Sequence, residues 1–220
     1  NNDWSTSSNW DSNAEPNASD DVTFPTGLAA TITTTSTELA LSLNFEDSYT
    51  LSGGTLSLSS GNSINVTDGV SATIDNRLNS TGDLTKTGNG TLTLGGNNTS
   101  LSGTVISAGK IRVTNSGALG SSGTATTVSG GSTLEISNIT LNRPITLNSG
   151  ATLTGTGNAT SNGVATIDAA ATSITLATAG TSDVFTLSNA SNELTGGSAS
   201  TVITLAGPGT VRLNDANNLT

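Results

Sequence analysis

Short runs in which apolar and polar residues alternate follow one another along the whole chain. A period of two is typical of a β-strand with one buried face, because successive side chains point to opposite faces. Clusters of Gly, Asn and Ser separate the runs, as turns require. No stretch shows sustained helical periodicity. The runs that predict strands are 22–24, 39–45, 56–58, 64–66, 92–94, 111–113, 134–136, 184–187, 202–205 and 211–213.

A short unit recurs within these runs: a glycine, one further residue, and two aliphatic residues two positions apart. Equivalent aliphatic positions recur every 19 to 23 residues or so, a period in the range of solenoid repeats. They are Leu92, Ile111, Leu134 and Leu153. The pattern predicts an all-β chain folded as a right-handed parallel β-helix, a solenoid of about ten coils.

Charged residues indicate which positions of each strand point outward. Lys110 and Arg112 flank Ile111, Glu135 lies between two aliphatic residues, and so does Arg212. A register slip of one residue would bury the charges, so the alternation specifies the register. We expect the aliphatic positions of the repeated unit to be buried, through Val211 and Leu213, and the interleaved polar positions to be exposed.

A β-sandwich would also consist of short strands, but two features favour the solenoid. Equivalent residues of successive coils stack on one another, which suits ladders of Asn, Ser and Thr, and these three with Gly make up more than half of the chain. Aromatic residues are only 3%, fewer than the core of a sandwich of this length usually holds.

Composition narrows the range of functions. The formal net charge is −10, with 6 Lys and Arg residues against 16 Asp and Glu, so the chain lacks the basic face that nucleic acid or anionic lipid requires. His and Cys are absent, which excludes Ser-His and Cys-His nucleophiles. No apolar run reaches the roughly 20 residues of a membrane span. We expect no nucleic-acid partner, no membrane insertion of this segment and no cofactor.

Residues 82–113, GDLTKTGNGTLTLGGNNTSLSGTVISAGKIRV, carry the most specific motif. The segment resembles the autotransporter-associated β-strand repeat, also called the passenger-associated transport repeat, of bacterial surface proteins. A partial second copy begins at residue 207 and places Asn217 at the repeat's Asn position. The resemblance implies a β-helical passenger displayed outside the cell. Matching positions include Leu84, Lys86, Gly88, Gly90, Leu92, Leu94, Asn98, Gly103, Gly109, Ile111 and Val113.

Candidate chemistry is sparse. A β-helical glycosidase or lyase would use carboxylates with Arg or Lys, and the candidates are Asp68, Asp75 with Arg77, and Asp168. Asp75 has the position of a turn residue, however, with Arg77 as a local partner. Asp20 and Asp21 are weak calcium candidates, because calcium needs six to eight oxygen ligands and a turn-capping role suffices for both. We assign no catalytic residue. The role expected for Lys86 is local: donation to turn carbonyls or pairing with Asp83.

The two ends of the chain differ in pattern. Residues 1–30, with Trp4 and Trp10, are expected to form an N-terminal cap, and residues 31–220 the β-helix. The C-terminal repeat lacks comparable cover, so we expect it to be completed by another copy, head to tail, or by adjacent repeats of a longer chain. The hypothesis is a structural or adhesive module of a bacterial cell-surface or extracellular fibre protein. A glycan-binding adhesin is the alternative, and a carbohydrate-active enzyme is a less favoured third.

Overall fold

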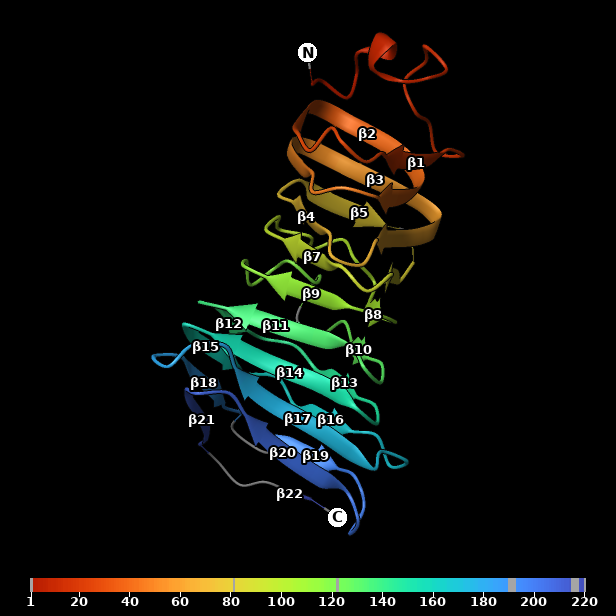
Figure 1. Cartoon of the computed structure of the whole chain (residues 1–220). Helices are drawn as coiled ribbons and strands as arrows, with labels where there is room; N and C mark the ends of the chain where they lie inside the picture. Colours follow the sequence, from red (N-terminus) through yellow and green to blue (C-terminus); the bar gives the residue numbers. More distant parts are fainter. Residues whose placement is uncertain (1, 81, 122, 190–192, 215–217, 220) are drawn as a thin grey trace.

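The computed structural model describes residues 2–80, 82–121, 123–189, 193–214 and 218–219. Its strands run parallel and stack as the coils of a β-solenoid, with the N-terminal coil at the top of Figure 1 and the C-terminal coil at the bottom. The expected all-β class and parallel β-helix architecture are confirmed. The helical element among these residues is a single 3-10 turn, η1 (Ser7–Asn9), and no helix there is long and apolar enough to cross a membrane.

Each complete coil has three sides, and strands stack along each side in parallel register. Two long strands, β2 (Thr31–Phe45) and β3 (Thr50–Val66), bend around all three sides of the first two coils. The first side holds β1 (Asp21–Phe24), the ends of β2 and β3, β6 (Leu84–Thr87), β8 (Thr104–Ile106), β10 (Thr126–Val128), β13 (Ile145–Leu147), β16 (Ala165–Ile167), β19 (Leu194–Gly196) and β22 (Asn218–Leu219).

The second side is the longest uninterrupted ladder after the first, and the third side is broken in its middle. The second side begins with the starts of β2 and β3 and continues through β4 (Ser71–Ile74), β7 (Thr91–Leu94), β9 (Lys110–Val113), β11 (Thr133–Ser137), β14 (Ala151–Thr156), β17 (Ser173–Thr178) and β20 (Val202–Ala206). The third side holds the middles of β2 and β3, then β5 (Arg77–Ser80), β12 (Thr140–Leu141), β15 (Asn158–Ser161), β18 (Val184–Leu187) and β21 (Thr210–Leu213).

The number of coils is smaller than expected. About seven turns carry a strand on all three sides of the described chain, so the expectation of about ten coils is slightly too high. One cause is the length of the loops: the two turns between β7 and β10 have no strand on their third side, and Leu205 pairs with Leu176, 29 positions earlier. The ladder starts at β1, which coincides with the strand predicted over 22–24, inside the segment 1–30 that was expected to form the cap and entry segment.

The register of the second side agrees with the sequence pattern. Leu92 pairs with Ile111, which pairs with Leu134, and the column continues through Leu153 to Leu176. All five side chains are fully buried. The aliphatic column is therefore the core of the solenoid, in which each coil covers the one before it. The predicted buried positions Leu56, Leu58, Leu94, Val113 and Ile136 are confirmed as well.

Three parts of the exposure prediction are wrong. Leu213 is 45% exposed and Val211 only partly buried, although both were expected in the core. Glu135 is buried although it points outward between Leu134 and Ile136, because side chains of the neighbouring coil cover it. Arg212 is exposed as expected, whereas Lys110 and Arg112 are partly buried, since neighbouring coils are only about 4.8 Å away.

Truncation of the core column should have a large effect. Leu92→Ala leaves a cavity between three coils and should lower the free energy of unfolding by about 2 to 5 kcal/mol. The matched control is Thr93→Ala, one position along β7, whose side chain is only partly buried. Urea denaturation of both variants measures the difference, and equal losses would contradict the assignment of the inward face.

Candidate functional site

Lys86 occupies an inward position of the first side and has no exposed surface. In the ladder it lies between Ile64 and Ile106. Its Nζ donates to the carbonyls of Thr87 at 2.6 Å, Gly88 at 2.7 Å and Ala108 at 3.3 Å. The expected donation to turn carbonyls is therefore confirmed, and burial lowers the pKa of Lys86 to about 8. Through these hydrogen bonds Lys86 links the corner of its own coil to the corner of the next coil.

The glycines of the repeat lie at the same corner, where successive coils approach closely. Gly88 and Gly109 have φ angles of 70° and 67°, in the left-handed region that glycine tolerates. A Cβ atom on Gly88 would lie 2.3 Å from the carbonyl oxygen of Val66, and one on Gly109 would lie 2.5 Å from that of Gly88. The spacing of these glycines therefore follows from stacked corners and does not indicate a phosphate loop.

Asn98 links neighbouring coils on the third side, in the stretch between β7 and β10 where the described residues form no strand on that side. Its Oδ1 accepts a hydrogen bond from the backbone N–H of Leu78 at 2.7 Å, and its Nδ2 donates to the carbonyl of Ala118 at 2.7 Å. These partners belong to the preceding and the following coil, and Asn98 itself is fully buried. One side chain thus bridges three coils where no ladder forms. The corresponding residue of the partial second repeat, Asn217, lies outside the described residues.

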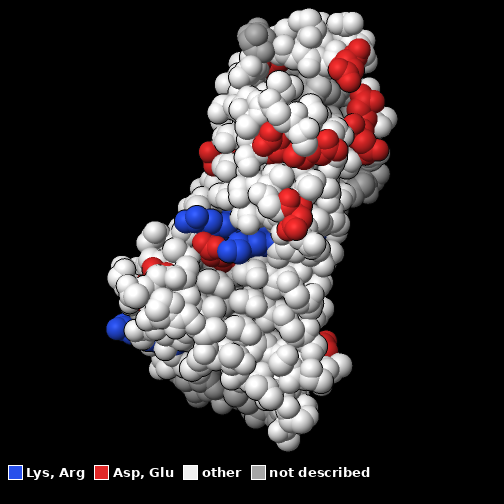
Figure 2. Space-filling view, in the orientation of Figure 1, with Lys and Arg blue, Asp and Glu red and all other residues white. Residues whose placement is uncertain are grey.

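A cluster of charged side chains lies on the outer face of the second side. Glu135 pairs with Lys110 at 2.9 Å and with Nε of Arg112 at 3.3 Å, and it accepts a hydrogen bond from Thr156 at 3.0 Å. The cluster joins three coils from outside and appears as the mixed blue and red group in the middle of Figure 2. No ion pair between Lys86 and a carboxylate occurs in the described part of the chain.

Aromatic residues concentrate at the N-terminal end. Trp4 is fully buried, and its ring lies 5.0 Å from that of Trp10 and 6.1 Å from that of Phe24, measured between centroids. Phe24 stacks on Phe45 at 4.6 Å. The indole N–H of Trp10 donates to the carbonyl of Trp4 at 2.7 Å. Both tryptophans thus cover the apolar interior of the first coil, where the sequence places a cap.

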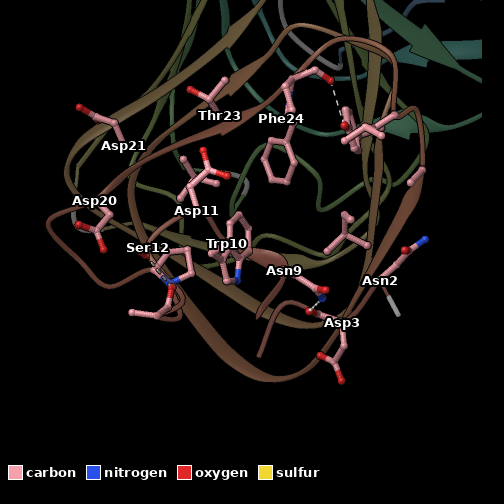
Figure 3. Close-up of a pocket in the computed structure, with 18 of the residues that line it drawn as sticks. Asn2, Asp3, Asn9, Trp10, Asp11, Ser12, Asp20, Asp21, Thr23 and Phe24 are labelled. Carbon is pink, nitrogen blue, oxygen red and sulfur yellow. Dashed lines mark hydrogen bonds between the residues drawn. The ribbon is translucent and has the colours of Figure 1, made fainter. Parts of the chain in front are cut away.

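Asp20 and Asp21 lie beside a cavity at this end (Figure 3) but do not converge on one point with further ligands. Asp20 accepts hydrogen bonds from the backbone N–H and side chain of Asn17, and Asp21 accepts one from the Ser42 hydroxyl. Among the residues that the structure describes, no group of three or more His, Cys, Asp or Glu side chains could hold a metal ion. The contacts of Asp20 are those of a turn cap.

The carboxylates considered for catalysis lie on different coils. Asp75 follows β4, Asp168 follows β16, and four coil levels, about 19 Å, separate them. A pair of carboxyl groups that cleaves a glycosidic bond stands about 5 to 9.5 Å apart. Arg77 donates to Ser100 at 3.0 Å. The structure therefore does not bring these residues together.

Charge is distributed unevenly along the solenoid. Residues 1–83 hold eleven of the sixteen acidic residues and only one of the six basic residues, Arg77. Red side chains accordingly dominate the upper part of the face in Figure 2. The asymmetry is a property of the sequence, and stacking of the coils places it at the N-terminal end of the solenoid.

No protein-family model, curated protein or solved structure matches the chain.

The buried ammonium of Lys86 makes stability depend on pH. Its pKa is about 8 in the folded protein and near 10.5 when the chain unfolds, so above pH 8 the unfolded state binds more protons. The free energy of unfolding should therefore rise between about pH 8 and pH 10, by about 1 to 2 kcal/mol. Urea denaturation at a series of pH values measures the rise.

Lys86→Met is the matched variant, since it keeps an apolar stem and removes the titrating group. It should flatten the rise over this range. Above about pH 10 Arg143 and Tyr49 complicate the profile, because burial lowers the pKa of Arg143 to about 10 and raises that of Tyr49. A rise that persists in Lys86→Met would contradict the assignment.

The bridging role of Asn98 can be tested separately. Asn98→Ala leaves the N–H of Leu78 and the carbonyl of Ala118 without their partner, so the free energy of unfolding should fall by about 2 to 4 kcal/mol. Asn97→Ala changes the same residue type at the adjacent, exposed position and should cost less than about 0.5 kcal/mol. Similar losses in the two variants would show that the bridge contributes little.

Proposed function

We propose that this chain is a structural module of a bacterial cell-surface or extracellular fibre protein. Its solenoid continues by addition of further coils to the exposed face of its last coil. The repeat over residues 82–113 supports the class of protein, because the motif is similar to that of autotransporter passengers. The extracellular location follows from the same resemblance.

The last described coil carries the main observation. Leu205 is in register with Leu176, and Leu213 with Leu187. Leu176 is fully buried and Leu187 is 1% exposed, whereas Leu205 is 63% and Leu213 45% exposed. Within the described residues, these inward positions are covered in the preceding coils and exposed in the last described one. An apolar surface of this kind, next to unpaired strand edges, favours pairing with another coil.

The opposite end supports a direction of growth. There the rings of Trp4, Trp10 and Phe24 close the apolar interior. One covered and one uncovered end give the module a polarity, which favours head-to-tail continuation over a symmetric contact. The further coil belongs either to adjacent repeats of a longer chain or to a second copy.

The rival functions depend on other features. A glycan-binding module is favoured by the partly exposed ring of Trp10 beside a cavity. An enzyme of the β-helical lyase or glycosidase class finds less support, because Asp75 and Asp168 lie on different coils. The structural role ranks first because it uses the stacked coils and their aliphatic core, which extend along the described solenoid.

Light scattering on the 220-residue chain tests the exposed coil. We expect concentration-dependent self-association beyond a dimer, since head-to-tail contacts do not close. Leu205→Asn with Leu213→Asn should reduce the association at least about tenfold, because the substitutions remove apolar surface from the contact.

The matched control is Leu39→Asn, which changes a 39% exposed leucine on the side of the solenoid. It should leave association unchanged. A monomer at all concentrations would exclude contact between copies and leave adjacent repeats of a longer chain as the cover. Association that stops at a dimer would contradict the head-to-tail arrangement.

A further inference from the structure

A cavity of about 680 Å³ lies at the N-terminal end, between the segment that precedes β1 and the first coil. Figure 3 shows Trp10 near its centre, with Phe24 beside the ring. Its size is in the range of cavities that hold small organic ligands. Apolar and acidic side chains share the lining, which includes Trp10, Phe24, Tyr49, Asp3, Asp11, Asp20 and Asp21.

The aromatic side of the cavity is held rigidly. Trp10 is fixed by its hydrogen bond to the Trp4 carbonyl and by edge contact with the rings of Trp4 and Phe24. Its N–H is therefore already used, while its ring remains partly exposed. A fixed aromatic face of this kind stabilises an apolar ring or an organic cation placed against it.

The carboxylates flank this ring. In Figure 3, Asp20 and Asp21 lie on one side of Trp10 and Asp3 on the other, with Asp11 near the ring. Asp3 and Asp20 each accept local hydrogen bonds through one carboxylate oxygen, and Asp21 accepts one from the Ser42 hydroxyl through one oxygen. Their second oxygens accept no hydrogen bond in the described structure, and Asp11 is exposed there without a hydrogen bond.

No Lys or Arg is among the described residues that line the cavity, and the first basic residue of the chain is Arg77. The lining thus combines a negative potential with a fixed aromatic face. A neutral ligand would use only the ring, and an anion would be repelled. We propose that this cavity binds a small organic ammonium ligand, with the ammonium group between the carboxylates and the carbon skeleton against Trp10.

An amino sugar and a polyamine both supply such an ammonium group. The proposal does not rest on the structural function proposed above, because the cavity and the exposed coil occupy opposite ends of the solenoid. Loss of ligand binding would leave self-association intact, and a monomeric protein could still bind the ligand.

Intrinsic fluorescence provides a selective readout, since Trp4 and Trp10 are the only tryptophans. The intact chain is titrated with a glucosamine tetramer, its fully N-acetylated counterpart, spermidine and calcium chloride, at low and at high salt. We expect saturable changes with the glucosamine tetramer that weaken at high salt, and little change with the acetylated tetramer. A stronger response to the tetramer than to spermidine would identify an amino sugar, and the reverse a polyamine.

Asp11→Asn combined with Asp21→Asn should weaken binding at least about fivefold, because partly exposed ion pairs contribute modestly. Asp68→Asn combined with Asp168→Asn, which changes exposed acids outside the cavity, is the matched control and should have no effect.

Three results would overturn the proposal. Equal binding of the acetylated tetramer would show that the charge is irrelevant. Calcium binding that excludes both ammonium ligands would indicate an inorganic cation site. A loss of self-association in the cavity variant, without any ligand response in the unmodified chain, would assign the cavity to contact between copies.

Discussion

Stacking of coil on coil is the constraint on which the rest of this structure depends. A single coil of about 20 residues cannot enclose an apolar core, so each inward side chain is covered only by its equivalents in the neighbouring coils. The column from Leu92 to Leu176 shows the result, with every member fully buried. Leu205 shows the converse: the same position in the last described coil is 63% exposed.

Polar groups follow the same constraint. Lys86, Asn98 and Glu135 are all buried, and each makes its hydrogen bonds or ion pairs to more than one coil. Lys86 fastens a corner, Asn98 bridges a side that has no strand, and Glu135 joins coils from outside. A thin core with few aromatic residues is thereby supplemented by polar links that fix the vertical spacing.

The apolar interior is covered at the N-terminal end of the described solenoid and exposed at its last described coil. At the N-terminal end, the tryptophans and Phe24 close the interior, and the segment that carries them encloses an acidic cavity. At the last described coil, the apolar positions remain open. This difference gives the described solenoid two ends with distinct chemistry, an aromatic and acidic surface at one and exposed leucines at the other.

The sequence by itself determined the strands with the clearest alternation and the register of the second-side aliphatic column, because alternation and the interval between repeated units are local properties of the chain. Strands with weaker alternation, such as β8, β13 and β16, were not among the predicted runs. Leu92, Ile111, Leu134 and Leu153 pair as their spacing predicts. It did not determine the number of turns, since the length of a loop does not reveal whether its residues form a third side. Nor could it show that Glu135 is covered, that Asn98 bridges coils or that scattered acids gather around Trp10. Those facts depend on which residues lie one coil apart, and only the tertiary structure decides this.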